Sequence, residues 1–413
     1  MYEMEQIDER VILVGSDTGN EDAANRSLDE LSELAKTAKA AVVGRLIQPR
    51  ESAHPGTYIG KGKLTELKDL IWETDATGII CDDELTSAQL GNLEEELSCK
   101  IIDRTLLILD IFAARAVSGE GKIQVELAQL RYRASRLAGL GRSLSRLGGG
   151  IGTRGPGEKK LEMDRRLIRE RISRLKKELK DVEKHRELIR TQRKQSGLKV
   201  AALVGYTSAG KSSIENVLTN AGILEDAMLF STLDTTTRSL VLDNTQEILV
   251  TDTVGFIRKL PHHLVEAFKS TLEEAKYADI IIHVVDASNP QMDEQMHVVY
   301  DTLRQLGAAD RPVITLFNKQ DKLESAGSYR DFQAEYSIPA SAKTGEGLAE
   351  LKKALLEIVR REQIYVERLY DFSEASKIQL IRSRGQLLSE KYVPEGIEVK
   401  AYVPKDIYGK VCI

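Results

Sequence analysis

The chain has 413 residues and a formal net charge of −5 at pH 7. No apolar run approaches the roughly 18 residues that a membrane helix needs, and the acidic first ten residues do not resemble a signal peptide. Three widely spaced cysteines fit a reducing compartment, so we expect a cytoplasmic chain without a membrane span, of a length that predicts two to four domains. The negative net charge would argue against a nucleic-acid partner, but the charge is segregated along the chain.

Residues 1–115 alternate between short apolar runs and stretches rich in Leu, Ala and Glu. This alternation predicts a small N-terminal α/β domain in which helices and a sheet form layers. A turn with two glycines and two lysines at 58–63 favours an ordinary loop over a phosphate site. The apolar runs predict strands at 11–14, 41–46, 78–81 and 100–102.

Residues 116–197 are basic and show helical periodicity. Between 131 and 194, 21 lysines and arginines stand against 8 acidic residues. Apolar residues recur every three or four positions at 123–137 and again at 168–189, which predicts two helices packed as an antiparallel hairpin. The tip at 139–157 is rich in glycine and arginine and has almost nothing to bury, so we expect it to bind a polyanion.

The arginines of this tip indicate contact with RNA. Arginine pairs with phosphates through two parallel bonds and stacks on bases, which lysine does less well. The lysine-bearing part at 176–194 is equally well interpreted as a solvated helix face. The predicted RNA contacts in the tip are Arg142, Arg146 and Arg154.

The most informative motif lies at residues 205–212, between the apolar run 200–204 and a predicted helix. Its spacing is that of a phosphate-binding P-loop. The glycines let backbone N–H groups curl around a β-phosphate, Lys211 reaches the β- and γ-phosphate oxygens, and the Ser212 hydroxyl can bind Mg²⁺. The predicted nucleotide-binding residues of this segment are Gly205, Tyr206, Thr207, Ser208, Ala209, Gly210, Lys211, Ser212 and Ser213.

A second predicted strand, at 248–251, ends in the residues expected to contact Mg²⁺ and the γ-phosphate. The carboxylate of Asp252 can hold Mg²⁺ through water, and the N–H of Gly255 can meet the γ-phosphate. The predicted nucleotide-binding residues of this segment are Asp252, Thr253, Val254 and Gly255.

A third predicted strand, at 313–317, delivers the residues that read the base. The Asp321 carboxylate can accept two N–H bonds from guanine, whereas adenine presents no matching pair of donors. Lys319 can lie along the base, and a backbone N–H at 341–343 can donate to the guanine carbonyl. The sequence therefore predicts GTP or GDP, bound by Asn318, Lys319, Asp321, Ser341, Ala342 and Lys343.

The predicted fold class is multidomain α/β. Residues 198–361 are the size of one nucleotide-binding domain and are expected to form a Ras-like P-loop GTPase domain. Residues 362–413 are expected to form a small C-terminal α/β domain, with a helix at 374–388 and a strand at 396–403.

Four segments carry a resemblance to a known family: the glycine-rich residues 148–158, Phe-x-Thr-Leu-Asp at 230–234, Asp-Thr-Val-Gly-Phe-Ile at 252–257, and residues 260–268. Together they resemble the HflX family, ribosome-associated GTPases of the Obg-like translation-factor group. The resemblance extends from the N-terminal domain through the C-terminal one. It implies a cytoplasmic, Mg²⁺-using GTPase that binds the large ribosomal subunit and its rRNA, with members that split stalled or idle ribosomes under stress.

The resemblance also assigns a switch segment. Thr232 is expected to complete the Mg²⁺ shell through its hydroxyl, and Thr236 is the alternative because Thr235 to Thr237 offer several hydroxyls in the same loop. A polar loop threonine without a metal role is the plain alternative for either. The nucleotide-binding residues implied for this segment are Phe230, Ser231, Thr232, Leu233 and Asp234.

Two departures from the family pattern bear on binding and packing. Lys159 and Lys160 replace Thr-Gln and should strengthen contact with RNA phosphates. Glu215 puts a charge on the helix after the P-loop where an apolar residue is usual, so the packing there is expected to differ.

Phe256 predicts slow hydrolysis by the protein alone. A glutamine often orients the attacking water at the position after Gly255, and phenylalanine has no group to do so. We expect in-line attack of water on the γ-phosphate, with Mg²⁺ and Lys211 neutralising the developing charge and a partner accelerating the reaction. The residues expected to act in catalysis are Lys211, Thr232 and Gly255.

Three functions are compatible with these features. The first is a GTP-gated factor that splits ribosomes, the second a GTPase in large-subunit biogenesis, and the third a non-ribosomal switch that binds a protein effector. In the third, the basic hairpin would be a solvated coiled coil. Nothing in the sequence demands more than a monomer.

Overall fold

The computed structural model describes residues 9–17, 19–50, 52–147, 156–219, 229–230, 236–242, 246–259, 269–323 and 329–412, with backbone only at 138–147, 156–161, 194–196 and 269–272. The chain divides into two compact units. The first unit comprises Met1–Val182, Met228–Phe230 and Lys259–Lys269, and the second comprises Glu183–Ala227, Ser231–Arg258 and Ser270–Ile413. Among the described residues, no helix combines the length and the apolar character needed to cross a membrane.

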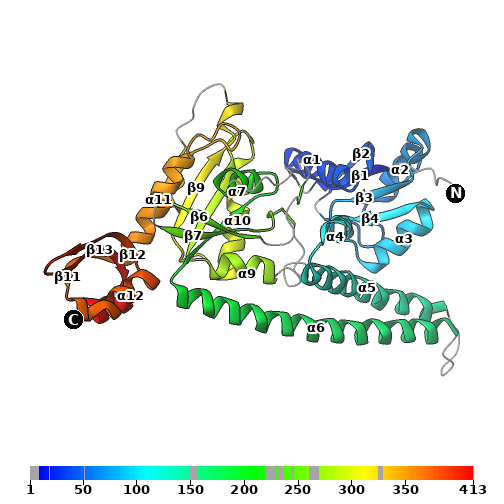
Figure 1. The fold of residues 1–413 in the computed structure, drawn as a ribbon. Coiled ribbons are helices and arrows are strands. Elements are labelled where there is room, and N and C mark those ends of the chain that lie inside the picture. Colours follow the sequence, from blue (N-terminus) through cyan, green and yellow to red (C-terminus); the bar gives the residue numbers. More distant parts are fainter. Residues whose placement is uncertain are drawn as a thin grey trace, which may run out of the picture. The chain divides into compact units, whose positions relative to one another are not determined.

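A parallel four-stranded sheet forms the centre of the first unit (Figure 1). Its strands run in the order β2-β1-β3-β4, and β1 pairs with both β2 and β3. In β1, Val11 to Val14 are all at most 2% exposed, as expected for a parallel strand covered on both faces. The predicted α/β fold is thus confirmed, with β1 at Arg10–Asp17, β2 at Ala41–Pro49, β3 at Gly78–Cys81 and β4 at Lys100–Asp103.

The helices of this sheet begin at polar capping residues. The side chains of Asn20, Thr86 and Asp103 each accept a backbone N–H in the first turn of the helix that follows. These caps explain why α1, α3 and α4 start where they do. The bounds are Glu21–Thr37 for α1, Lys61–Thr74 for α2, Ser87–Leu97 for α3 and Arg104–Arg115 for α4.

The two long helices α5 (Gly119–Leu147) and α6 (Pro156–Ser196) run side by side (Figure 1). Arg171 of α6 donates from Nε and Nη2 to both carboxylate oxygens of Glu126 in α5, at 2.7 and 2.8 Å. Leu175 is buried at the seam, as its heptad position predicted. Helix α5 continues to Leu147, so the first part of the predicted tip at 139–157 is helical. The leucines and arginines of this part favour a helix strongly enough to offset its two glycines, each of which costs about 1 kcal/mol.

The second unit contains a six-stranded sheet in the order β10-β9-β8-β5-β7-β6. All neighbouring strands are parallel except β6 and β7. The strands are β5 (Lys199–Gly205), β6 (Thr237–Val241), β7 (Glu247–Asp252), β8 (Ile280–Asp286), β9 (Val313–Asn318) and β10 (Tyr336–Pro339). The helices are α7 (Lys211–Thr219), α9 (Lys269–Tyr277), α10 (Met292–Leu306) and α11 (Leu348–Arg361), with a short 3₁₀ turn η1 at Gln320–Lys322.

A three-stranded antiparallel sheet ends the chain, in the order β11-β13-β12. The helix predicted at 374–388 is wrong in its last four residues, because α12 stops at Arg384 and a strand begins at Gln386. A Cβ on Gly385 would lie 2.9 Å from the carbonyl oxygens of both Ile381 and Tyr402, so the chain must turn at a glycine there. The elements are β11 (Gln363–Tyr370), η2 (Phe372–Glu374), α12 (Ala375–Arg384), β12 (Gln386–Val393), β13 (Gly396–Pro404) and α13 (Lys405–Cys412).

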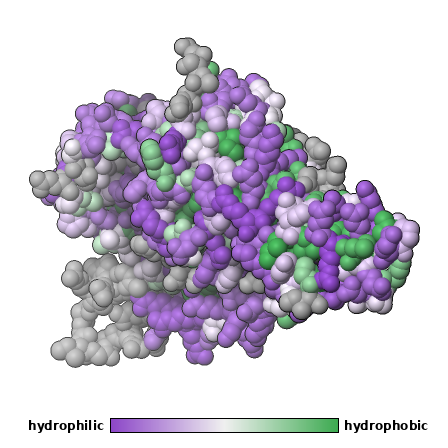
Figure 2. All heavy atoms as spheres, turned by 90° about the vertical axis from the view of Figure 1, so that its left-hand side faces the viewer, coloured by the Kyte–Doolittle hydropathy of each residue, from purple (hydrophilic) through white to green (hydrophobic). Residues whose placement is uncertain are grey.

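This C-terminal sheet buries one face and exposes the other. Val399, Ala401 and Val403 of β13 are fully buried, whereas Tyr365 and Leu369 of β11 are 45% and 47% exposed. Hydrophobic patches also stand out on the otherwise hydrophilic face seen in Figure 2. The apolar side chains of this sheet therefore divide between a core and the surface.

Candidate guanine-nucleotide site

The P-loop connects the end of β5 to the start of α7. Strand β5 ends at Gly205 and α7 begins at Lys211, which is the strand–loop–helix context that the motif requires. Gly210 has φ +95°, and a Cβ there would lie 2.3 Å from Asn318 Nδ2, so only glycine fits. The N-terminus of α7 thus follows directly on a loop whose backbone N–H groups can bind an anion.

Lys211 is buried at the centre of this loop. Its Nζ donates to the carbonyl oxygens of Gly205 at 3.2 Å and Tyr206 at 3.0 Å. Burial lowers the pKa of Lys211 to about 8, and the negative charge of Asp252 opposes this effect only in part. A phosphate beside Nζ would supply the missing negative charge.

Ser212 and Asp252 lie together as the sequence predicted for an Mg²⁺ site. Ser212 Oγ donates to Asp252 Oδ2 at 3.0 Å, and Asp252 is buried at the end of β7. A hydroxyl and one carboxylate, with phosphate and water as further ligands, are the hard oxygen donors that Mg²⁺ prefers at nucleotides. Ser212 and Asp252 could therefore hold Mg²⁺ jointly with a nucleotide.

Glu215 is a further buried carboxylate in this part of the site. It lies on α7, and both of its carboxylate oxygens accept from Thr236 Oγ1, at 3.2 and 3.1 Å. Burial, then the charge of Asp252, raises the pKa of Glu215 to about 7. Thr236, the alternative Mg²⁺ ligand, is thus bonded to Glu215 in this structure; a charge at a usually apolar helix position was the sequence signal for this contact.

Phe256 pairs with the P-loop through its backbone. Its N–H donates to the Gly205 carbonyl at 3.1 Å, and its own carbonyl accepts from the Thr207 N–H at 2.8 Å. The ring is 2% exposed. The residue after Gly255 is therefore a buried hydrocarbon that presents no group to a water molecule.

The end of β9 connects the P-loop to the loop at 341–343. Asn318 Nδ2 donates to the Ala209 carbonyl at 2.8 Å, and Asn318 Oδ1 accepts from the Ala342 N–H at 3.0 Å. Asp321 Oδ1 accepts from Ser341 Oγ at 2.7 Å, a bond that lowers the pKa of Asp321. Asn318 is thus a structural bridge, which sequence reasoning missed, while the exposed Asp321 can still accept from a base.

The remaining predicted residues of the nucleotide site occupy varied positions. Lys319 Nζ pairs with Asp286 at 2.7 Å, and Thr253 Oγ1 donates to the Leu203 carbonyl at 2.7 Å in the core. Tyr206, Thr207, Ala209 and Val254 are buried, Ser213 is half-buried, and Ser208 and Lys343 are exposed.

Phe230 has a packing contact in the structure that the sequence did not predict. It belongs to the first unit, where it is 3% exposed and packs edge-to-face on Phe112 with ring centroids 4.6 Å apart. Its ring therefore makes a hydrophobic contact within the first unit, and its contact to the nucleotide stays a prediction. Outside the described residues or side chains lie Ser231, Thr232, Leu233, Asp234, Arg142, Arg146, Arg154, Lys159 and Lys160.

Three family models match successive parts of the chain. They are described as GTP-binding GTPase N-terminal at residues 25–113, GTP-binding GTPase middle region at 115–193, and 50S ribosome-binding GTPase at 200–319. A solved GTP-binding protein from Sulfolobus solfataricus in complex with GDP is 26% identical, with a TM-score of 0.44 and coverage of 86% of this chain and 99% of that chain.

Curated relatives match over nearly the full length. GTPase HflX from Lacrimispora saccharolytica is 62% identical over 411 residues, which cover 100% of this chain and 97% of the relative. GTPase HflX from Escherichia coli is 39% identical over 389 residues, covering 94% and 89%. With this identity over nearly the whole chain, the chain belongs to the HflX family of GTPases.

Proposed function

We propose that this GTPase binds the large (50S) ribosomal subunit through rRNA when GTP is bound, and that it splits stalled or idle ribosomes in the cytoplasm as a monomer. The observation that carries the proposal is a row of exposed cations on α6 in a chain that matches the 50S ribosome-binding GTPase model. The residues that the structure describes form no ion pair with Arg169, Arg174, Lys176, Lys177 or Lys180.

Ion pairing along α6 supports this assignment. The acidic partners near the helix neutralise only part of its charge: Glu126 pairs with Arg171, and Glu274 pairs with Arg190 at 2.8 Å. When a basic side chain binds an RNA phosphate, counterions are released from the RNA, which favours binding. A lysine or arginine without an acidic partner gains more binding free energy in this way than a paired one does. The predicted contacts of the tip, Arg142, Arg146, Arg154, Lys159 and Lys160, would extend this surface.

Hydrolysis would reset the factor. Lys211 and the N–H of Gly255 would stabilise the γ-phosphate as water attacks it in line, while Mg²⁺, held by Ser212 and Asp252 with Thr232 or Thr236, would supply positive charge. Since Phe256 offers no group to orient that water, we propose slow hydrolysis by the protein alone and acceleration by the ribosomal subunit. Equal turnover with and without 50S subunits would contradict this.

Sedimentation tests the ribosomal role. Purified 70S ribosomes are mixed with the protein and either a non-hydrolysable GTP analogue or GDP, then separated on a sucrose gradient. We expect the analogue, but not GDP, to convert 70S particles into subunits, with the protein in the 50S fraction. Replacing Arg142, Arg146 and Arg154 by Gln should abolish splitting, whereas Gln at the control residues Lys36, Lys68 and Lys353 removes equal charge without effect.

Other outcomes identify the alternatives. Co-sedimentation with 50S subunits while 70S particles stay intact would favour the role in large-subunit biogenesis. Failure to sediment with any ribosomal particle in either nucleotide state would favour the protein-effector switch. If rRNA is the partner, 50S affinity should also fall steeply between about 50 and 200 mM salt.

A further inference from the structure

A cavity of about 380 Å³ lies in the second unit, where the last turns of α6 meet β6 and α9. Of the described residues, none that lines it belongs to the P-loop, so this cavity is distinct from the nucleotide site. Its volume falls within the roughly 300–1,000 Å³ that is typical of pockets for small molecules. The lining residues are Arg186, Ile189, Arg190, Arg193, Thr237 and Glu274.

The arginines of this lining come from one face of α6. Arg186, Arg190 and Arg193 are spaced by four and three residues, and residues at these spacings are neighbours on a helix surface. A guanidinium carries five N–H donors in a planar fork that matches the oxygens of a phosphate. Three such forks around one cavity therefore favour an oxyanion as the ligand.

Glu274 of α9 holds two of these side chains in place. Arg190 Nη2 donates to Glu274 Oε1 at 2.8 Å, and Arg186 Nη1 lies 3.9 Å from the same oxygen. The guanidinium of Arg190 also lies over the ring of Tyr277, 4.0 Å from its centroid. Because a guanidinium has more donors than these contacts use, Arg186 and Arg190 can keep Glu274 and still donate to a ligand.

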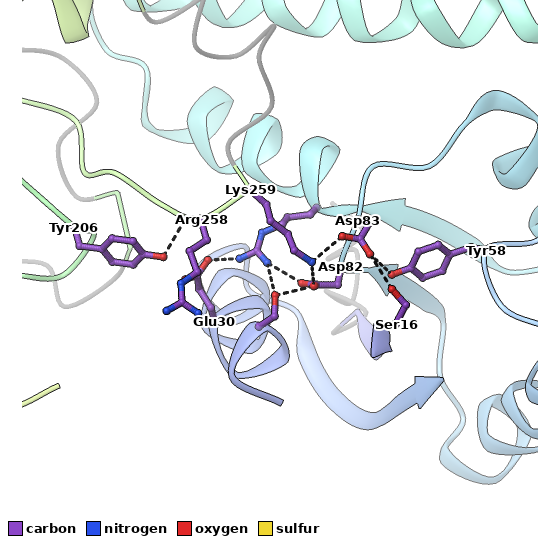
Figure 3. Close-up of polar contacts among 10 residues, drawn as sticks. Ser16, Glu30, Tyr58, Asp82, Asp83, Tyr206, Arg258 and Lys259 are labelled. Carbon is purple, nitrogen blue, oxygen red and sulfur yellow. Dashed lines mark hydrogen bonds and ion pairs between the residues drawn. The ribbon is translucent and has the colours of Figure 1, made fainter. Parts of the chain in front are cut away.

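The charges in this lining are balanced differently from those of a charged cluster in the first unit. There, the guanidinium of Arg104 pairs with Asp82 and Glu30. Lys259 Nζ donates to Asp83 Oδ1 at 2.7 Å and also pairs with Asp82 (Figure 3). Three carboxylates thus compensate two cations. Among the described lining residues of the cavity, three guanidiniums stand against one carboxylate, which gives a formal charge of +2.

Burial strengthens the effect of this positive charge. The side chains of Arg186 and Arg190 are 22% and 19% exposed, and Glu274 is 9% exposed. Charges that are largely shielded from water interact more strongly than charges at the surface. A dianion would match the formal charge of the lining, whereas a phosphodiester of an RNA backbone carries only one negative charge.

We propose that this cavity binds a phosphate dianion, either inorganic phosphate or the terminal phosphate of a small phosphate monoester. The two sources share the chemistry that the arginines recognise, an oxyanion with two negative charges and several acceptor oxygens. Thr237 of β6 adds a hydroxyl, which lies 3.0 Å from Thr251 Oγ1 and can donate to one partner while it accepts from another. The ligand would thus join α6, β6 and α9 around one anion, apart from the GTP site.

Equilibrium dialysis with radioactive inorganic phosphate tests the proposal without ribosomes, so its outcome does not depend on the proposed ribosomal role. The full-length protein is loaded with Mg²⁺ and a non-hydrolysable GTP analogue, which occupies the P-loop, and the ionic strength is held constant. We expect one phosphate to bind per chain, and Arg193→Gln to lower the affinity about tenfold or more. Absence of phosphate binding, or equal affinity in the variant, would overturn the proposal.

Glu274→Gln distinguishes a binding site from a purely structural cluster, because the two interpretations predict opposite changes. The amide keeps an acceptor for Arg190 and removes the negative charge from the lining, so phosphate affinity should rise about fivefold or more. A fall in affinity would show that Glu274 supports packing alone and would contradict the site. The matched control is Arg361→Gln, which should leave phosphate affinity unchanged. Arg361 also pairs with a glutamate, Glu335, and lies over a tyrosine ring, that of Tyr336, but it does not line the cavity.

Competition with two further anions identifies the source of the phosphate. Glycerol 3-phosphate is a small monoester, and displacement of radioactive phosphate by it would assign the site to phosphorylated small molecules. Failure of this ester to compete would assign the site to inorganic phosphate. Dimethyl phosphate is a monoanionic diester like the RNA backbone, and it should bind at least about tenfold more weakly than inorganic phosphate. Equal binding of the diester would overturn the assignment to a dianion and favour RNA.

Discussion

The carboxyl edges of the four-stranded sheet in the first unit and the six-stranded sheet in the second unit differ in how their buried cations are compensated. At the edge of the second sheet, the buried Lys211 contacts two backbone carbonyl oxygens, and burial has lowered its pKa to about 8. At the edge of the first sheet, burial would lower the pKa of Arg104, but contacts with Glu30 and Asp82 raise it. The buried cation of the first edge is thus compensated by carboxylates that contact it, whereas at Lys211 the charge of Asp252 offsets the effect of burial only in part.

This contrast shows that sheet topology determines where a ligand site can form, and that the charge at the sheet edge determines which kind of ligand binds there. Both edges lie where strands of an open parallel sheet end. A glycine-rich loop and a lysine favour a polyanion from solution, while two aspartates favour a cation that the chain itself supplies through Lys259. The stability of a domain whose sheet edge carries the glycine-rich loop and the lysine should therefore depend on added ligand. The stability of a domain whose edge carries the aspartates should not.

The largest effect is expected at Asp321, a carboxylate of the second edge that remains available to a ligand. Asp321→Asn replaces the acceptor of two guanine N–H groups by an amide, so GTP affinity should fall about 100-fold or more. The amide can donate to the carbonyl that xanthine carries in place of the guanine amino group, so affinity for xanthosine triphosphate should rise.

Fluorescence titration with labelled GDP and xanthosine diphosphate measures both changes. Asp310→Asn makes the same replacement at an exposed residue outside the site and is the control. An equal loss of affinity for both bases would show that Asp321 supports the loop without reading the base.

The next effect tests whether the first edge is neutralised from within. Arg104→Met removes the buried cation and leaves Asp82 and Glu30 uncompensated, so the local stability of β3 should fall by about 3 kcal/mol. Hydrogen exchange at Ile79 and Ile80 reports this loss. Adding Asp82→Asn should recover part of it, whereas Arg45→Met, which breaks an exposed pair with Asp29, should cost less than about 1 kcal/mol.

Most strands of the four-stranded and six-stranded sheets could be predicted because their signal is local, whereas β6 and β10 were not predicted. A strand covered on both faces needs a continuous apolar run, and such runs are visible at 11–14, 78–81 and 313–317. The end of the chain was harder, since β12 is stabilised by pairing with β13 in a half-exposed sheet. Its residues 386–388 also fit the end of a helix. Only the close approach of backbone carbonyl oxygens to Gly385 shows that the chain changes from helix to strand there.

The nucleotide site likewise contains features that could be predicted from local sequence patterns and contacts that could not. The P-loop and its order relative to Asp252 and Asp321 are sequence patterns, and the structure brings Ser212 and Asp252 together as predicted. The bridge from Asn318 to the P-loop spans 109 residues, and the contact of Lys259 with Asp83 spans 176. Such pairs leave no periodic trace in a single sequence, so they could not be predicted from it.

The smallest expected effect is the pH dependence of nucleotide binding at the second edge. The pKa of Lys211 is lowered to about 8 without ligand, and a bound phosphate must raise it by favouring the charged amine. Binding therefore takes up a proton above pH 8: GTP affinity should be constant below this pH and fall by up to about tenfold per pH unit above it. Titrations between pH 7 and 9.5 measure this slope. In the variant Lys211→Arg, the arginine stays charged over this whole pH range, so the slope should disappear. Ionisation of the guanine ring affects both proteins equally. Parallel pH profiles would mean that Lys211 is already fully charged before the nucleotide binds, and the two edges would then differ less in charge than their contacts indicate.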